Sequence, residues 1–284
     1  MIEKERSWLL AHADEDLSDV CAIKYLELVE RRYAGEPIQY ITGQTEFYGL
    51  PFRVTPAVLI PRPETEHLVE KVLALAASFT APRIVDVGAG SGAISITLAL
   101  HLPQSVVTAI DLSPAALDVA RQNAALNGLA DMAGSTSAPC PILPAFGAGR
   151  VGGQESLPGQ FRSPRIRFLQ GDLLAPVADE QFEIVVSNPP YVPLADRSEL
   201  SVEVREHEPA LALFAGDDGL LLYRRLISEA SSVLVPGGWL LLEIGYGQEP
   251  SIRALLTAAG FAEIEFFPDL RGIARVAMGR KRHG

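Results

Sequence analysis

The sequence predicts an α/β fold in which a doubly wound, mainly parallel sheet follows a small N-terminal helical region and a β-hairpin. From Arg83 onward, short runs of Val, Ile and Leu alternate with segments of helical periodicity, as is typical of parallel sheets covered by helices on both faces. The helical pattern at the start of the chain lies apart from this alternation. The last two predicted strands have no helix between them, so we expect the final strand to be antiparallel.

The N-terminal region is predicted to be a small helical domain over residues 1–44. A helix is expected over residues 18–33, ended by Gly35, with a second short piece near residues 8–11. The apolar side chains at helical spacing are Ala22, Leu26, Val29 and Tyr33. These helices are too few to form an independent bundle, so we expect them to pack against the next domain. We interpret this domain as a shortened one that docks the substrate.

Residues 45–62 are predicted to form a β-hairpin that links the two domains. Aromatic and β-branched residues alternate there with Gly49, Pro51 and Pro56, a composition typical of short strands and tight turns. The Pro-Arg-Pro-Glu-Thr-Glu segment that begins at Pro61 then opens a helix, because an apolar face follows it at helical spacing.

The third predicted domain, residues 63–284, carries the alternating strands and helices. Strands are expected at residues 84–87, 106–110, 165–169, 183–187, 239–244, 261–267 and 273–278. Helices are expected at residues 91–100, 114–126, 219–234 and 250–259. Residues 131–164 are rich in Gly, Pro, Ser and Ala without a sustained period, so we interpret them as a flexible surface insertion.

Composition indicates a cytoplasmic chain without a membrane span. The net charge of −11 argues against a protein that binds chiefly by neutralising phosphates. Cys21 and Cys140 form no metal-ligand spacing and no disulfide framework. The N-terminus lacks the apolar stretch of a signal peptide, and Glu243 and a Pro-Gly-Gly sequence interrupt the longest apolar run. We therefore expect no metal, no membrane contact and no direct nucleic-acid binding, and we expect a monomer.

A glycine-rich turn follows the first strand of the sheet and opens a helix. Its residues are Gly88, Ala89, Gly90, Ser91 and Gly92. Glycines allow a sharp turn and a close approach of a ligand to the backbone. Asp111 ends the next strand, where its carboxylate can accept both hydroxyls of a ribose. This pattern fits both NAD and S-adenosyl-L-methionine, and each piece on its own can be an ordinary turn or helix cap.

The ends of the third and fourth strands favour S-adenosyl-L-methionine as the cofactor. Asp172 and Leu173 place a carboxylate and an apolar side chain where an adenine amine and ring face would lie. The sequence shows no His, Lys or Tyr in a proton-relay spacing for alcohol oxidation. An Asn-Pro-Pro-Tyr stretch, which hydride transfer does not need, follows the fourth strand.

That stretch, Asn188, Pro189, Pro190 and Tyr191, is the predicted catalytic and substrate-binding corner. Two prolines cannot continue a central strand, so the chain leaves the sheet at Asn188 with a stiffened backbone. The Asn188 carboxamide and the Pro189 carbonyl then offer two fixed acceptors beside the Tyr191 ring. Such a corner suits a planar NH2 group, either an amide or a nucleobase amine.

These motifs resemble class I S-adenosylmethionine-dependent methyltransferases, which have a Rossmann-like sheet. More specifically, Glu-Pro-Ile-Gln-Tyr-Ile-Thr-Gly from Glu36, Glu-Phe-Tyr-Gly from Glu46 and the segment at Pro61 resemble the release factor N5-glutamine methyltransferases of the HemK/PrmC type. So does Glu-His-Glu-Pro-Ala-Leu from Glu206.

The resemblance implies methyl transfer from S-adenosyl-L-methionine to the Gln of a release factor's Gly-Gly-Gln loop, leaving S-adenosyl-L-homocysteine. It also implies that residues 88–92, Asp111, Leu173 and Asn188 contact the cofactor and that residues 188–191 hold the substrate Gln. The insertion carries its own Gly152-Gly153-Gln154, either by chance or as a pseudosubstrate. No strong general base is expected, so we predict capping or surface roles for His207 and Glu208.

Two other interpretations remain open. A nucleic-acid amino-methyltransferase would share Asn-Pro-Pro-Tyr but would need a basic groove or a target-recognition domain. A catalytically silent partner module would keep the cofactor pocket without activity. A methyl-transfer assay separates both from the release factor enzyme.

Overall fold

The computed structural model describes residues 10–12, 14, 18–131 and 165–283. The expected insertion, including Gly152-Gly153-Gln154, lies outside these residues except for Asp131. Residues 8 and 9 of the helical piece expected near residues 8–11 also lie outside them, whereas Leu10 and Ala11 are helical. Among the described residues, no helix has both the length and the apolar character that a membrane span requires.

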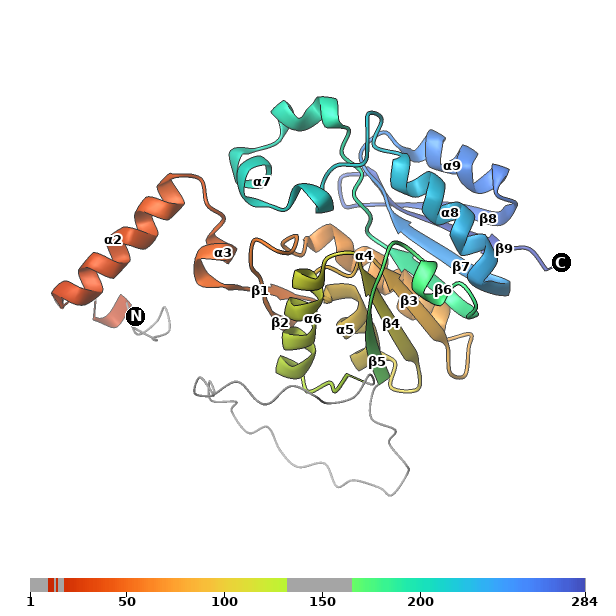
Figure 1. Cartoon of the computed structure of the whole chain (residues 1–284), viewed down its shortest axis with the longest axis horizontal. Coiled ribbons are helices and arrows are strands. Elements are labelled where there is room, and N and C mark those ends of the chain that lie inside the picture. Colours follow the sequence, from red (N-terminus) through yellow and green to blue (C-terminus); the bar gives the residue numbers. More distant parts are fainter. Residues whose placement is uncertain (1–9, 13, 15–17, 132–164, 284) are drawn as a thin grey trace, which may run out of the picture.

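Seven strands form the central sheet, in the order β5-β4-β3-β6-β7-β9-β8 (Figure 1). In chain order they are β3 (Arg83–Val87), β4 (Val106–Asp111), β5 (Arg165–Gln170), β6 (Phe182–Ser187), β7 (Leu234–Glu243), β8 (Phe261–Pro268) and β9 (Ala274–Lys281). Strands β5, β4, β3, β6 and β7 pair in parallel, whereas β9 is antiparallel to both of its neighbours. The predicted doubly wound α/β sheet with a reversed last strand is confirmed.

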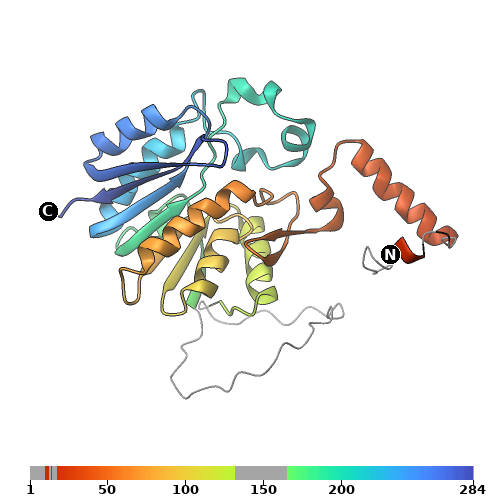
Figure 2. The same ribbon diagram turned by 180° about the vertical axis from the view of Figure 1, so that it is seen from behind.

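Helices cover both faces of the sheet (Figures 1 and 2). One face carries α4 (Pro63–Ala76), α5 (Ala93–His101) and α6 (Pro114–Leu126), and the other carries α8 (Leu221–Val233) and α9 (Glu249–Ala258). Successive strand residues enter opposite layers, as Ile84 packs in the first and Val85 in the second. This double burial explains why the strands are continuous apolar runs.

Strand β7 begins five residues earlier than the sequence predicts. Phe182 pairs with Leu234, but Ile184 pairs with Trp239, so the register shifts between them and β7 takes up a Pro-Gly-Gly bulge. A Cβ on Gly238 would lie 3.0 Å from the carbonyl oxygen of Glu183. Glycine therefore permits the close backbone approach that lets the strand extend through the bulge.

The N-terminal helix α2 (Asp19–Tyr33) projects from the body, followed by α3 (Ile38–Thr42) (Figure 1). The bounds of α2 match the prediction, but within the described part of the chain its apolar face is not buried against the next domain, whereas Tyr40 of α3 packs with Ala116 and Val119 of α6. No residue of α2 is buried, and Leu26 and Tyr33 are 58% and 95% exposed. Arg32 forms an ion pair with Glu203 of α7 (Val202–His207).

The predicted hairpin forms from β1 (Gln44–Phe47) and β2 (Leu50–Arg53), and it is part of the core. Phe47 and Phe52 are fully buried in the layer under α4 to α6. Asn123 of α6 fixes the hairpin, because its oxygen accepts the Arg53 N–H at 2.7 Å and its Nδ2 donates to the carbonyls of Arg53 and Ser91.

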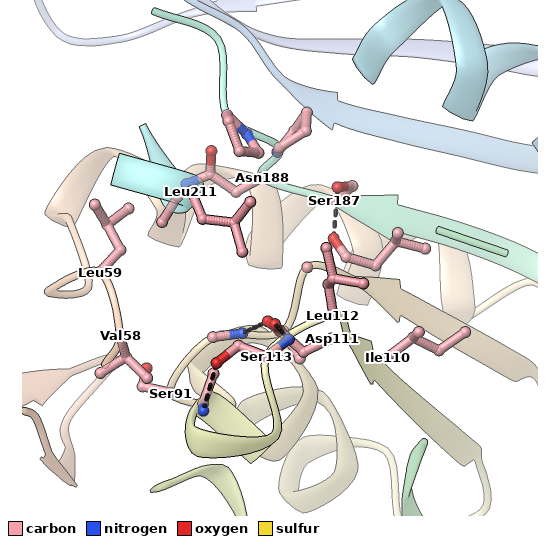
Figure 3. A pocket seen from close by; sticks show the side chains of 18 of the residues that line it. Val58, Leu59, Ser91, Ile110, Asp111, Leu112, Ser113, Ser187, Asn188 and Leu211 are labelled. Carbon is pink, nitrogen blue, oxygen red and sulfur yellow. Dashed lines mark hydrogen bonds between the residues drawn. The ribbon is translucent and has the colours of Figure 1, made fainter. Parts of the chain in front are cut away.

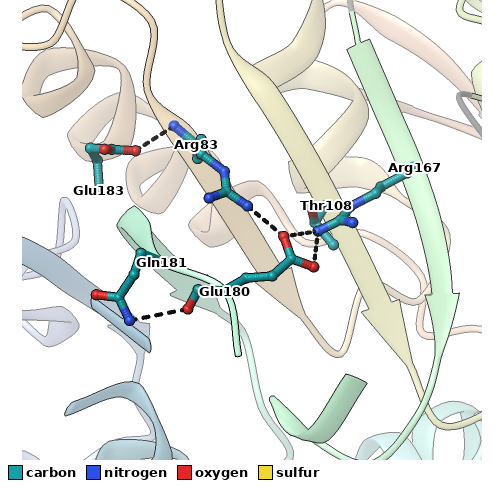
Figure 4. Close-up of polar contacts among 6 residues, drawn as sticks. All are labelled: Arg83, Thr108, Arg167, Glu180, Gln181 and Glu183. Atoms are coloured by element: carbon teal, nitrogen blue, oxygen red, sulfur yellow. Dashed lines mark hydrogen bonds and ion pairs between the residues drawn. The ribbon is translucent and has the colours of Figure 1, made fainter. Parts of the chain in front are cut away.

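A polar cluster joins the strands away from their carboxyl ends (Figure 4). Glu180 precedes β6 and accepts hydrogen bonds from the guanidinium groups of Arg83 and Arg167, the latter at 2.7 Å. Arg167 also donates to the Thr108 hydroxyl at 2.8 Å, and Glu183 accepts the Arg83 backbone N–H at 2.7 Å. These contacts link β3, β4, β5 and β6 at the sheet edge opposite the site.

Candidate active site

A cavity of about 410 Å³ lies at the carboxyl edge of the sheet (Figure 3). The ends of β5, β4, β3 and β6, four adjacent strands, open into it. The chain crosses from β3 toward β5 and then returns to the other side of β3 with β6. Open α/β sheets bind ligands at such a reversal of strand order.

Nearly all predicted site residues line this cavity. The lining includes Gly88, Ala89, Gly90, Ser91, Asp111, Asp172, Leu173, Asn188, Pro189 and Pro190. Gly92 does not line the cavity and is the N-cap residue of α5. Its φ is +80°, and a Cβ there would lie 2.8 Å from Ile96 Cδ1. Tyr191 also lies off the cavity and packs against the core layer under α8 and α9.

The glycine turn and Asp111 hold each other in place. The Asp111 Oδ2 accepts the Gly90 N–H at 2.7 Å, and its Oδ1 accepts the Ser113 N–H at 2.8 Å. Gly90 has φ +56°, a backbone conformation that strongly favours glycine in such a turn. Burial raises the pKa of Asp111, and the N–H donors of Ser113 and Gly90 act against that rise. The carboxylate is thus held at the cavity wall by backbone groups (Figure 3).

Asp86 lies behind the same turn and is fully buried. Its Oδ2 accepts the Ser95 N–H at 3.1 Å, whereas its Oδ1 has no hydrogen-bond partner among the described residues. Burial raises the pKa of Asp86 to about 7. The side chain therefore braces the start of α5 and does not face the cavity.

At the end of β5, Asp172 and Leu173 take different roles in the wall. Asp172 is half-exposed, and its Oδ2 accepts a hydrogen bond from Arg225 at 2.7 Å. Leu173 has φ +48° and lines the cavity. Gly171 precedes them because a Cβ there would lie 2.1 Å from Pro176 Cγ.

The corner after β6 places Asn188 across the cavity from Asp111 (Figure 3). The Ser187 hydroxyl donates to the Val87 carbonyl at 2.6 Å, which ties the end of β6 to β3. The Asn188 Nδ2 donates to the Thr65 hydroxyl oxygen at 3.1 Å. The corner is also held from behind, because Gln248 donates to the Tyr191 carbonyl at 3.0 Å.

Tyr191 is partly buried against the core layer under α8 and α9. Burial raises the pKa of its hydroxyl to about 12, and the nearby Glu243 carboxylate adds to that rise. A Cβ on Gly245 would lie 2.9 Å from Tyr191 Cδ2. In this arrangement the ring supports the corner from the core side.

A second wall of the cavity comes from the segment after the corner, which contains η2 (Leu194–Glu199), α7 and η3 (Ala210–Ala212). Glu208 anchors this segment: its side chain is 1% exposed, forms an ion pair with Arg62 and accepts the Ile60 N–H at 3.3 Å. The expected surface role is therefore wrong for Glu208, although it does stand at the C-cap position of α7. Only the fold brings Arg62 to it.

Sequence reasoning also missed Thr65 and Glu243. Both are buried, and the Thr65 hydroxyl donates to the Glu243 carboxylate at 2.6 Å. Thr65 belongs to the segment at Pro61 that carries the family resemblance, which is the signal that could have indicated it. Among the described residues, no group of three or more His, Cys, Asp or Glu side chains could hold a metal ion.

The cavity suits S-adenosyl-L-methionine. Its volume is within the range of small-molecule sites. Gly88 and Gly90 leave open space beside the turn, the Asp111 carboxylate stands fixed in the wall, and Ile110, Leu112 and Leu173 add apolar surface. These groups have the chemistry that a ribose and a purine require.

Comparisons with known proteins address the family and the fold. A family model described as the PrmC N-terminal domain matches residues 1–43, and one described as a methyltransferase domain matches residues 80–133. Among solved structures, a methyltransferase from Pyrococcus furiosus covers 83% of this chain and 90% of its own, with a TM-score of 0.51 and 16% identity. The T. thermophilus 16S rRNA N2 G1207 methyltransferase (RsmC), in complex with AdoMet and guanosine, covers 84% of this chain and 50% of its own, with a TM-score of 0.53 and 18% identity. At these identities the structures show the fold alone.

Sequence relatives show the family. The release factor glutamine methyltransferase of Koribacter versatilis is 38% identical over 278 residues, which cover 98% of this chain and 86% of that protein. The release factor glutamine methyltransferase of Burkholderia pseudomallei is 41% identical over 276 residues, which cover 97% of this chain and 86% of that protein. The chain therefore belongs to the release factor glutamine methyltransferases, a family of S-adenosylmethionine-dependent enzymes.

Proposed function

We propose that this enzyme methylates the side-chain amide nitrogen, N5, of the Gln in the Gly-Gly-Gln loop of a peptide chain release factor. The observation that carries the proposal is the position of Asn188 at the cavity wall, with its amide nitrogen held by Thr65. Its Oδ1 accepts no hydrogen bond from the described residues and is available to a substrate N–H.

The proposed roles of the corner follow from the chemistry of a carboxamide. An amide nitrogen is a poor nucleophile because its lone pair is delocalised into the carbonyl. When the Asn188 Oδ1 and the Pro189 carbonyl each accept one N–H, the amide plane is fixed and electron density shifts toward nitrogen. The same two acceptors stabilise the positive charge that develops there. When bound, S-adenosyl-L-methionine supplies the electrophilic methyl group.

We assign the remaining contacts by position in the cavity. Asp111 would accept the ribose hydroxyls, Leu173 and Asp172 would face the adenine, and the turn at residues 88–92 would take the amino-acid end of the cofactor. Pro190 would border the substrate Gln beside Pro189. Tyr191 would act through the corner that it supports from the core side.

The N-terminal region is proposed to dock the release factor. We keep the division into a helical domain (residues 1–44), a hairpin (residues 45–62) and a methyltransferase domain (residues 63–284). The projecting helix α2 supports this assignment, because exposed apolar surface of this kind marks interaction sites. Its exposed apolar side chains include Val20, Ile23, Tyr25, Leu26 and Tyr33.

The test is to incubate the enzyme with a labelled methyl donor and a purified release factor, and to locate the methyl group by mass spectrometry. We expect one methyl group on the Gln of the Gly-Gly-Gln loop and none on a release factor in which that Gln is Ala. Label that enters only DNA or RNA would contradict the proposal.

A further inference from the structure

We infer that Thr65 and Glu243 form a buried relay that fixes which way round the Asn188 carboxamide faces, so that its oxygen and not its nitrogen is presented to the substrate. The inference deepens the proposed function, on which it rests, by naming two positioning residues for the same reaction.

Three separate elements bring the relay together. Thr65 lies in the first turn of α4, Glu243 is the last residue of β7, and Asn188 follows β6. The Thr65 and Glu243 residues are 4% and 3% exposed. The Thr65 Oγ1 lies 2.6 Å from the Glu243 Oε2 and 3.1 Å from the Asn188 Nδ2.

The donors and acceptors allow one direction through these contacts when Glu243 is ionised. A carboxylate only accepts hydrogen bonds, so the Thr65 hydroxyl must donate its one proton to Glu243. The hydroxyl oxygen can then only accept, and the Asn188 carboxamide must turn its NH2 toward Thr65. Its Oδ1 consequently faces away from Thr65, and in the proposed relay this is the atom presented to the substrate.

This orientation decides whether the corner can bind an amide. A substrate NH2 has two donors and needs acceptors. If the Asn188 carboxamide were reversed, its own NH2 would face the substrate NH2, and one of the two proposed acceptors would be lost. The preference for one orientation of the Asn188 carboxamide should therefore affect kcat.

The relay depends on the charge of Glu243. Burial raises its pKa to about 7, while the Thr65 hydrogen bond, Arg275 and the Asn188 amide lower it and Glu64 raises it. A protonated Glu243 can donate to Thr65, which frees the Thr65 hydroxyl to donate to Asn188 and permits the reversed carboxamide. The titratable groups that face Glu243 are Arg275 on β9, Glu64 on α4, Tyr191 in the corner and Tyr223 on α8.

A purely structural role for Thr65 and Glu243, as a buried contact between α4 and β7, makes different predictions. Loss of such a contact would lower stability and add to any effect at Asn188. A relay that acts through Asn188 loses its effect once the Asn188 carboxamide is gone. A double-mutant cycle separates these two roles.

The cycle uses Thr65→Val, Thr65→Ser, Asn188→Ala and the Thr65→Val/Asn188→Ala double variant, with a release factor as substrate. We expect Thr65→Val to lower kcat by about 10- to 100-fold, the loss typical of an outer-shell partner. KM and the Kd for S-adenosyl-L-methionine should change less than about threefold, and Thr65→Ser should restore most of kcat because it keeps the hydroxyl. The double variant should be no slower than Asn188→Ala. Additive losses in the double variant, or a folded Thr65→Val enzyme with wild-type kcat, would overturn the relay.

A second measurement reads the carboxamide without any assay of activity. The side-chain amide hydrogens of Asn188, identified by the NMR signal that Asn188→Ala removes, should exchange slowly with solvent in the wild-type enzyme. They should exchange faster in Thr65→Val. Failure of the wild-type enzyme to methylate a release factor would refute the proposed function, yet slow exchange would still support the relay. Fast exchange in the wild-type enzyme would refute the relay itself.

Discussion

The side-chain nitrogen of Asn188 lies 3.1 Å from the hydroxyl oxygen of Thr65, although 123 positions separate them in the chain. This contact joins the corner after β6 to the first turn of α4. On one side of the contact is Asn188, which is proposed to touch the substrate, and on the other is Thr65, which is proposed to orient Asn188.

Replacement of Asn188 by Ala should lower kcat by about two to three orders of magnitude, since one preorganised polar contact to the reacting group is lost. Affinity for S-adenosyl-L-methionine should fall much less. Steady-state kinetics and isothermal titration calorimetry measure the two effects. Asn127→Ala, at the end of α6 and off the cavity, is the matched control and should keep wild-type kcat. An Asn188→Ala enzyme with most of its kcat would show that the amide is held elsewhere.

Replacement of Asp111 by Asn should raise the Kd for S-adenosyl-L-homocysteine by about 10- to 100-fold. Hydrogen bonds to a charged group contribute roughly 1.5–3 kcal/mol, and Asn offers one acceptor in place of two. Calorimetric titration measures the change. Asp118→Asn, on the exposed side of α6, is the control and should bind normally. Equal affinities for the two variants would remove Asp111 from the cofactor site.

The kcat of the wild-type enzyme should fall as the pH drops below about 7. Burial raises the pKa of Glu243 to about 7, so this side chain is ionised above that pH and protonated below it. Because the relay needs the ionised Glu243 carboxylate, kcat should be highest above about pH 7 and should fall below it.

Two variants assign this acid limb to Glu243. Glu243→Gln cannot titrate, so its lower kcat should stay flat between pH 6 and 8. Asp86, whose pKa burial also raises to about 7, is the competing source of the limb. Asp86→Asn should therefore keep the acid limb. If the acid limb disappears in Asp86→Asn and survives in Glu243→Gln, the group that titrates is Asp86 and the relay does not explain the pH dependence.

Replacement of Glu180 by Ala should lower the free energy of unfolding by about 1–2 kcal/mol, because two guanidinium groups lose their shared partner. The contacts are partly exposed, which keeps the effect small. Urea denaturation measures it, and cofactor affinity should not change. Glu249→Ala, which removes an exposed pair with Arg253 on α9, should change stability by less than about 0.5 kcal/mol. Equal effects of the two substitutions would show that the cluster adds nothing beyond an ordinary surface pair.

The strand ends were predictable because their chemistry is local. Glycines at Gly88 and Gly90 mark the turn, Asp111 ends a β-branched run, and the two prolines after Asn188 stop a strand that their own backbones cannot continue. In a parallel sheet these ends meet at one edge, so their meeting in one cavity followed from the alternation of strands and helices.

Other features could not be predicted from local pattern. Glu243 reads in sequence only as a charge that interrupts an apolar run, and Glu208 only as a polar residue after a helix. Each is buried because a partner from a distant segment, Thr65 or Arg62, satisfies it. The apolar face of α2 was predicted to pack against the next domain, but helical periodicity does not distinguish a face that contacts the same chain from one that contacts a partner.

The sequence by itself determined the α/β sheet, the order of its strand-end motifs and the family, because hydrophobic period, glycine turns and proline stops act over a few neighbouring residues. The tertiary structure decided which way Tyr191 faces, how β7 absorbs its bulge and which buried partner orients Asn188. These outcomes depend on contacts between residues up to 178 positions apart, which form only when the layers close on one another.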